Sequence, residues 1–162
     1  ITRPTVDRVK EGMFSAVQFL LAGARVLDLF AGSGQLGIEA LSRGAARCVF
    51  IDSSREACAV VRQNLKAAGL FEKASVAETA AEMYLAACRE RFDLVLLDPP
   101  YRQGTVAALL PAVAAVTAPG GTVLAETEHG APLPERCGTL TLKKQYKYGT
   151  VALARYEADA EF

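Results

Sequence analysis

A short apolar run that ends in a glycine-rich turn is the feature that most constrains the fold of this chain. Val26 to Phe30 suit a buried strand, and Ala31-Gly32-Ser33-Gly34 leads from it into a segment with helical periodicity. Further apolar runs alternate with helical patterns downstream in the same way. This alternation is typical of an α/β fold with a mainly parallel sheet.

The same patterns predict where the individual elements lie. A first helix is expected after Thr5, and a second is expected to run from the glycine turn to near Gly44. The other helices are expected at residues 54–68, 80–88 and 105–116, and the strands at residues 26–30, 48–52, 74–77, 93–98 and 122–126. Pro119-Gly120-Gly121 is expected to turn into the last of these strands. Two late runs, 139–146 and 150–156, are joined by Tyr148-Gly149 and predict a closing antiparallel hairpin.

Size and composition indicate a single domain that covers residues 1–162. Hydrophobic residues make up 51% of the chain and charged residues 22%, which provides a core and argues against disorder. No apolar run approaches the roughly 18 residues needed to span a bilayer, and the first residues do not resemble a secretory leader. We therefore expect a cytoplasmic protein without a membrane partner.

The cysteines and the histidine give no support to a metal centre. Cys48, Cys58, Cys88 and Cys137 lie far apart and form no CxxC pair, so neither a disulfide framework nor a zinc site is expected. His129 is the only histidine. Since zinc sites are built from cysteine and histidine, we expect no metal.

The glycine turn after the first strand is a candidate cofactor loop. Gly32, Gly34 and Gly37 form a GxGxxG pattern between a strand and a helix, which is the context in which this otherwise weak motif indicates ligand binding. Ligands of open α/β sheets bind beyond the carboxyl ends of the strands. The loop contacts to a cofactor are expected from Phe30, Ala31, Gly32, Ser33 and Gly34.

Asp28 favours one of two cofactor classes. A dinucleotide would place its pyrophosphate over this turn, where a nearby carboxylate would repel it. S-adenosylmethionine has no phosphate and carries an ammonium and a sulfonium group, which suit a carboxylate at the end of the strand. Asp52, which ends the second strand, can accept hydrogen bonds from the ribose hydroxyls of either ligand, and Ser53 follows it in the expected cofactor site.

The segment Asp98-Pro99-Pro100-Tyr101 follows the fourth strand and is the candidate catalytic loop. Two prolines make the loop stiff, and an aromatic ring there can stack on a base, which contributes about 1–3 kcal/mol. An exocyclic amino nitrogen is a poor nucleophile because its lone pair is delocalised into the ring of the base. The Asp98 carboxylate and the Pro99 carbonyl can accept its two N–H groups and favour a pyramidal nitrogen, while Tyr101 fixes the plane of the base.

Five segments spread over nearly the whole chain carry a family resemblance. They are Arg3 to Glu11, Asp28 to Gly34, Leu41 to Ala45, Asp98 to Tyr101, and Tyr148-Gly149-Thr150. On these segments the chain resembles class I methyltransferases, and more narrowly the bacterial family that methylates the N2 amino group of a guanine in small-subunit ribosomal RNA. The resemblance implies a Rossmann-like, seven-stranded, mostly parallel sheet with one antiparallel strand in a C-terminal hairpin and helices on both faces. It also implies S-adenosylmethionine as cofactor, and ribosomal RNA or the assembling small subunit as partner.

The resemblance adds further residues to the expected cofactor site. It places the amino-terminal signature beside the cofactor, so Thr5 and Arg8 are expected to contact it, although Arg8 also fits a solvated helix face. Thr79 and Ala80 follow the third strand, where the adenine is expected. The family often has a second acid after the second strand, whereas Ser53 stands at that position here.

Signals for nucleic-acid binding outside these motifs are mixed. Lys143, Lys144 and Lys147 form a basic group on the late hairpin that can contact an RNA backbone, but exposed strands also carry lysine as protection against aggregation. The formal net charge is zero, whereas strong nucleic-acid binders are often basic.

Together these features predict a monomer that transfers a methyl group from S-adenosylmethionine to guanine N2 in small-subunit (16S) ribosomal RNA. Two other activities remain open on the residues alone. An adenine-N6 DNA methyltransferase can have the same catalytic loop, although the expected elements leave no room for an inserted target-recognition region. A nucleotide-cofactor oxidoreductase fits the GxGxxG pattern, and a non-catalytic RNA-binding module could have kept the fold.

Overall fold

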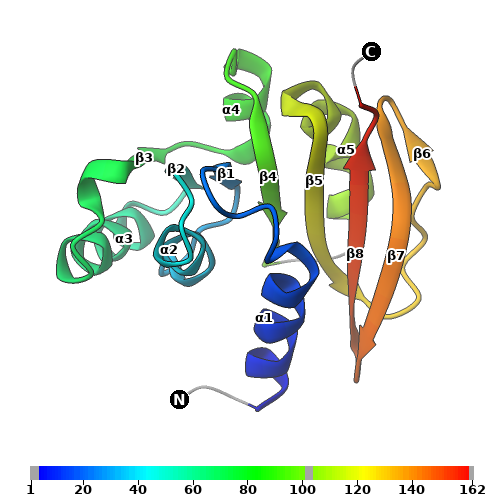
Figure 1. Cartoon of the computed structure of the whole chain (residues 1–162), viewed down its shortest axis with the longest axis horizontal. Helices are drawn as coiled ribbons and strands as arrows, with labels where there is room; N and C mark the ends of the chain where they lie inside the picture. The colour runs from blue at the N-terminus through cyan, green and yellow to red at the C-terminus, as the bar shows by residue number, and fades with distance from the viewer. Residues whose placement is uncertain (1–3, 101–103, 161–162) are drawn as a thin grey trace.

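One mixed sheet runs through the molecule and carries helices on both faces (Figure 1). The computed structural model describes residues 4–100 and 104–160, with side chains from residue 8 onward. In this part of the chain the sheet has eight strands in the order β3-β2-β1-β4-β5-β8-β7-β6. The helices are α1 Pro4–Val17, α2 Gln35–Ser42, α3 Arg55–Ala67, η1 Phe71–Lys73, α4 Ala81–Ala87 and α5 Thr105–Val116. The strands are β1 Arg25–Asp28, β2 Arg47–Asp52, β3 Ala74–Glu78, β4 Phe92–Leu97, β5 Thr117–Glu128, β6 Arg136–Cys137, β7 Leu140–Tyr148 and β8 Val151–Ala158.

Alternation along the central strands divides the core into two layers. Leu94 and Leu96 of β4 face the cluster that contains apolar residues of α1, α2 and α3. Val95 and Leu97 face the other cluster, which contains residues of α4 and α5. Both faces of β4 are therefore buried from Leu94 to Leu97, which is why these four residues form an unbroken apolar run in the sequence.

The prediction of a mostly parallel α/β sheet is confirmed, but the sheet has one strand more than expected. β1 to β5 run parallel, and β8 is antiparallel to both β5 and β7, as the predicted closing hairpin requires. The eighth strand is β6, which pairs antiparallel with β7 through Arg136 and Cys137. A strand of two residues has no period that a sequence pattern could show.

β5 begins earlier than expected. Pro119-Gly120-Gly121 was expected to precede the strand, but Thr117 already pairs with Phe92 of β4. The register then shifts, so that Thr122 pairs with Leu94, and Gly120 adopts a positive φ of 75°. The expected turn is thus an irregularity inside a longer strand, because pairing with β4 begins before it.

The chain crosses from one half of the sheet to the other between β1 and β4. The chain proceeds from β1 outward to β2 and β3, and then returns to pair β4 with the other side of β1. In open α/β sheets such a switch point opens a crevice at the carboxyl ends of the strands. Among the described residues, no helix is long and apolar enough to cross a membrane.

Candidate active site

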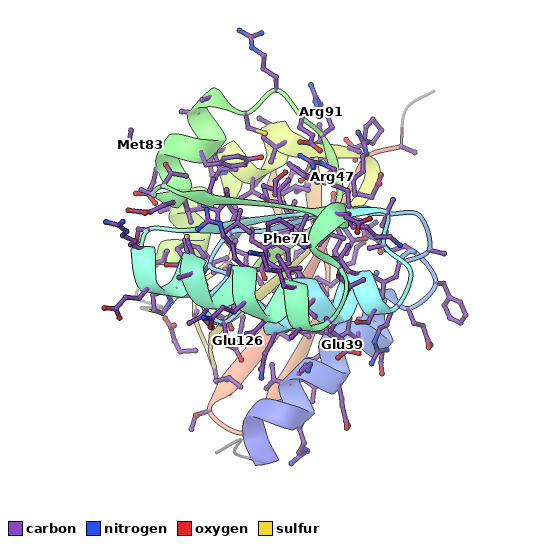
Figure 2. The ribbon with its side chains drawn as sticks, turned by 90° about the vertical axis from the view of Figure 1, so that its left-hand side faces the viewer. Glu39, Arg47, Phe71, Met83, Arg91 and Glu126 are labelled. Carbon is purple, nitrogen blue, oxygen red and sulfur yellow. The ribbon has the colours of Figure 1, made fainter. Side chains whose placement is uncertain are left out.

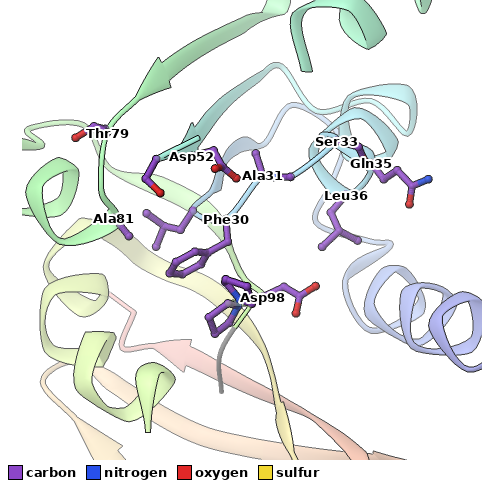
Figure 3. Close-up of a pocket in the computed structure, with 14 residues that line it drawn as sticks. Phe30, Ala31, Ser33, Gln35, Leu36, Asp52, Thr79, Ala81 and Asp98 are labelled. Carbon is purple, nitrogen blue, oxygen red and sulfur yellow. Dashed lines mark hydrogen bonds between the residues drawn. The ribbon is translucent and has the colours of Figure 1, made fainter. Parts of the chain in front are cut away.

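A cavity of about 560 Å³ opens at this switch point, beyond the carboxyl ends of β1, β2 and β4 (Figure 3). Its size suits a small-molecule ligand. Phe30, Asp52 and Asp98 reach it from the ends of three neighbouring strands. The described residues that line it are Leu29, Phe30, Ala31, Gly32, Ser33, Gln35, Leu36, Asp52, Ser53, Thr79, Ala81, Asp98, Pro99 and Pro100.

The glycine loop forms one wall of the cavity and is held by several hydrogen bonds. Gly34 donates its N–H to the Ala31 carbonyl at 2.7 Å, which closes a tight turn. Gly32 and Gly34 have φ values of 58° and 86°, a region that favours glycine. The Asn64 side chain of α3 donates to the Ser33 carbonyl at 2.8 Å and braces the loop from outside. The loop is therefore positioned before any ligand binds.

Asp28 lies beneath this loop and is only 1% exposed. Its Oδ2 accepts the Gly37 N–H at 3.2 Å, and its buried Oδ1 has no hydrogen-bond partner among the described residues. Burial raises the pKa of Asp28 to about 7, and the carboxylates of Asp98 and Asp52 also raise it, while N–H donation from Gly37 and Phe30 lowers it. An unpaired, buried acceptor oxygen of this kind is suited to a cationic group on a ligand.

Asp52 ends β2 with both carboxylate oxygens oriented by the backbone. Gly32 donates its N–H to Oδ2 and Ser54 donates its N–H to Oδ1, both at 2.9 Å. Each oxygen keeps a lone pair for a further donor. Thr79, at the end of β3, donates its N–H to the Asp52 carbonyl at 3.0 Å and completes this side of the cavity. The pair of oriented acceptors suits the two hydroxyls of a ribose.

Asp98, Pro99 and Pro100 form the opposite wall. The carboxylates of Asp98 and Asp52 both raise the pKa of Asp28, so each of them lies within electrostatic reach of Asp28. A cavity with this arrangement attracts cations and repels phosphates. Of the two cofactor classes considered, the electrostatics favour the sulfonium compound.

Most residues expected in the site lie together, and the exceptions are informative. Gly34 and the buried Asp28 lie behind the cavity wall, and Ala80 immediately precedes the lining residue Ala81. Arg8 does not line this cavity but a second hollow between α1 and β7. Tyr101 and the side chain of Thr5 lie outside the described residues.

The cavity also contains lining residues that the sequence motifs did not indicate. Gln35 and Leu36 are the first residues of α2, directly after the glycine loop, and the position of Gly34 as the N-cap could have pointed to them. Leu29 and Ala81 gave no such signal, because an apolar residue beside a strand end or helix start is common in any α/β fold.

Comparison with known proteins shows relatives that match nearly the whole chain. The protein named "Putative rRNA methyltransferase YlbH" of Bacillus subtilis is 40% identical over 161 residues, which cover 96% of this chain and 88% of the relative. Ribosomal RNA small subunit methyltransferase D of Escherichia coli is 32% identical over 98% of this chain and 81% of the relative.

Solved structures and a family model agree with these relatives. A structure described as "Putative methyltransferase yhhF" from Escherichia coli superposes with a TM-score of 0.87 at 31% identity, over 98% of this chain and 89% of that chain. An RNA methyltransferase of Salinibacter ruber in complex with S-adenosyl-L-homocysteine shares the fold, with a TM-score of 0.74 at 17% identity over 100% of this chain and 96% of that chain. The family model described as Conserved hypothetical protein 95 matches residues 1–157. The chain therefore belongs to the Conserved hypothetical protein 95 family and is a relative of ribosomal RNA small subunit methyltransferase D.

Proposed function

We propose that this protein transfers a methyl group from S-adenosylmethionine to the N2 amino group of a guanine in small-subunit ribosomal RNA. The observation that carries the proposal is the shared cavity, in which a glycine loop and the Asp98-Pro99-Pro100 segment face each other, with Asp52 on the lining and the buried Asp28 behind it. The relatives named as ribosomal RNA methyltransferases support the substrate class. A ribosomal RNA substrate also agrees with a cytoplasmic location.

The residues of the cavity fit this cofactor group by group. Asp28 has an unpaired buried oxygen for the cationic end of the cofactor, and Asp52 has two oriented acceptors for the ribose hydroxyls. The N-cap of α2 is Gly34, which gives no side-chain cap, so the N–H groups of Gln35 and Leu36 at the start of the helix are suited to the cofactor's carboxylate. We assign the adenine to the side of the cavity that Thr79 and Ala81 line.

Asp98 and Pro99 have the chemistry to hold the acceptor amine. The bound cofactor supplies an electrophilic methyl group on its sulfonium. A carboxylate oxygen of Asp98 and the Pro99 carbonyl accept the two N–H groups of the amine, which withdraws the nitrogen lone pair from the ring of the base. The N–C bond would form as the bond from the methyl carbon to the sulfonium sulfur breaks, with its electron pair remaining on sulfur. The amine would lose one proton in the same transfer, and we assign Asp98 as the group that accepts it. The stiff Pro99-Pro100 backbone keeps both acceptors in place.

A transfer assay with labelled cofactor tests the substrate. We expect label in protein-free small-subunit ribosomal RNA or in stripped small subunits, and none in duplex DNA. Mass mapping of the labelled RNA should place the methyl group on a guanine N2. Label in DNA alone, or on a base other than guanine, would reject the proposed substrate.

Replacement of Asp98 tests the catalytic assignment. Asp98→Asn keeps the shape of the side chain but removes its charge and proton-accepting capacity, so we expect the transfer rate to fall by about 10²- to 10⁴-fold. Binding of S-adenosylhomocysteine, measured by calorimetry, should persist. Asp93→Asn is the matched control, because Asp93 lies at the other end of β4 and pairs with Arg25. Full transfer activity in Asp98→Asn would remove this residue from the mechanism.

A further inference from the structure

A second hollow lies between α1 and β7, apart from the candidate active site. Its volume is about 410 Å³, and its lining includes Tyr146 and Tyr148 of β7 and Arg8, Glu11 and Ser15 of α1. Figure 1 shows α1 beside the β7–β8 turn, at the bottom of the view. Neither the cofactor nor the catalytic loop needs these residues in the reaction proposed above.

The close packing of α1 against β7 forms one side of this hollow. Gly12 lies in the middle of α1, where glycine is a much poorer helix former than alanine. A Cβ at this position would meet the Tyr148 hydroxyl at 2.0 Å and the adjoining ring carbon at 2.6 Å. Gly12 therefore leaves room for the Tyr148 ring. This ring is half-buried against the helix and contributes to the wall of the hollow.

The sheet register places this hollow at the same edge as the catalytic loop. Through β5 and β8, the pairing aligns Leu97 of β4 with Gln145 of β7, so that Asp98 and Tyr146 follow at the same level. β7 is the third strand across from β4. With strands about 4.8 Å apart, the two positions are about 14 Å from each other. An RNA strand that presents a base to Asp98 can therefore reach Tyr146 with a neighbouring nucleotide.

The side chains around the hollow match the parts of a nucleotide. Tyr146 and Tyr148 are half-buried aromatic rings on one face of β7, and every nucleic-acid base has a flat face that stacks on such rings. The Lys144 ammonium lies 4.9 Å from the centre of the Tyr146 ring, and the exposed Arg8 lies at the rim of the hollow. These cations suit phosphates, and the exposed Glu11 carboxylate can accept an N–H of a base.

We propose that this hollow is a second nucleotide subsite, which binds a base of the RNA strand close to the methylated guanine by stacking on Tyr146. The proposal rests on the proposed function for its substrate class. A chain with a net charge of zero gains little RNA affinity from overall electrostatic attraction. The proposed subsite on β7 supplies sequence-tolerant affinity through stacking instead.

Titration with a fluorescein-labelled, single-stranded RNA oligonucleotide of mixed sequence tests the subsite. Tyr146→Leu keeps the apolar packing but removes the ring, so we expect the Kd for RNA to rise by about 5- to 150-fold, the equivalent of a stacking contribution of about 1–3 kcal/mol. Tyr146→Phe should retain the affinity of the unmodified protein. The Kd for S-adenosylhomocysteine should be unchanged in both variants.

Phe71→Leu is the matched control. The Phe71 ring also lies beneath a lysine, with Lys66 at 5.1 Å, but it belongs to η1, next to β3 at the far end of the sheet from β7 (Figure 2). If this variant lost as much RNA affinity as Tyr146→Leu, the subsite would be rejected. If Tyr146→Leu failed to fold, Ser15→Gln would partly fill the hollow from an exposed helix position and should weaken RNA binding by several fold.

The outcomes separate this inference from the proposed function. Unchanged RNA affinity in folded Tyr146→Leu, or no RNA binding by the unmodified protein, would overturn the subsite even if ribosomal RNA is methylated. Absence of methyl transfer to any ribosomal RNA would overturn the proposed function, while the RNA titration would still decide whether Tyr146 binds a base.

Discussion

Burial of a carboxyl group in an apolar interior costs free energy when the group is ionised, and Asp28 is buried at the end of β1. Its pKa is raised to about 7, chiefly by burial, so near neutral pH the protonated and ionised forms are both populated. The carboxyl group is thus held in a state that a nearby cation would convert to the charged form. This coupling predicts opposite effects on stability and on cofactor binding.

The first prediction concerns the stability of the cofactor-free protein. The unfolded chain ionises Asp28 near pH 3.8, whereas the folded protein ionises it near pH 7, so this group's contribution is fully present below pH 3.8 and is lost as the pH rises to about 7. Asparagine cannot ionise, so Asp28→Asn avoids this loss of stability. The variant should be more stable than the unmodified protein at pH 8, by as much as about 4 kcal/mol, with a smaller difference at pH 5. Urea denaturation at both pH values measures the difference in free energy of unfolding between the two proteins. A variant that is less stable at pH 8 would contradict the assignment.

The second prediction concerns cofactor affinity as a function of pH. In the proposed complex the ionised form of Asp28 would attract the ammonium of the cofactor, so the affinity for S-adenosylhomocysteine should increase as the pH rises from 6 to 8. Asp28→Asn should bind more weakly and lose this dependence. Calorimetry at several pH values, in buffers of different ionisation enthalpy, would also detect the proton released on binding. An equally steep pH dependence in the variant would assign it to another group.

Among the secondary structure elements, α2 depends on an unusually close approach to β2. A Cβ at Gly37 would lie 2.3 Å from the Phe50 ring and 2.8 Å from the Cys48 sulfur, and both of these side chains are fully buried. Gly37→Ala should therefore destabilise the fold by about 1–3 kcal/mol, although alanine is the better helix former. Ser42→Ala, at an exposed position of the same helix, is the control. Equal stability of the two variants in urea denaturation would show that α2 shifts without cost.

The sequence predicted best those elements in which the apolar residues have a regular spacing and the ends are marked by clear boundary residues. α5 begins and ends where expected, and α3 differs by one residue at each end because Ser54 is its N-cap and accepts the Ala57 N–H. The start of β5 was wrong because its first pairing depends on β4, which local sequence does not reveal. β6 was missed for the same reason, since its two residues are strand only through β7.

The residues of the candidate site also divide into those that the local sequence indicates and those that depend on tertiary contacts. Gly32, Asp52 and Asp98 were predictable, because a glycine turn and strand-terminal acids have a chemical meaning at the carboxyl edge of a parallel sheet. Arg8 was expected beside the cofactor, but it lines the hollow against Tyr146. The choice between these positions depends on how α1 packs against the hairpin, which is a tertiary contact between the two ends of the chain.

Across the whole molecule, a net charge of zero conceals an uneven distribution. Two carboxyl groups line the cavity and a third, that of Asp28, lies behind its wall, while exposed lysines lie along β7. The first group suits a cationic cofactor, and the second suits a polyanionic substrate. A charge balance taken over the full sequence therefore gives little information about nucleic-acid binding in this protein.

The last prediction uses the cofactor as a ligand of the whole fold. The cavity takes its walls from the ends of β1, β2 and β4 and the starts of α2 and α4, so a ligand there binds the folded state only. At 100 times its Kd, S-adenosylhomocysteine should stabilise the protein by about 2.7 kcal/mol, which raises Tm by about 5–10 °C in a domain of this size. NADH at the same concentration should leave Tm unchanged, because its phosphates would face Asp52 and Asp98, with Asp28 behind the cavity wall. Differential scanning fluorimetry compares the effects of the two ligands on Tm. A rise in Tm with NADH but none with S-adenosylhomocysteine would identify the cavity as a dinucleotide site and reject the proposed cofactor.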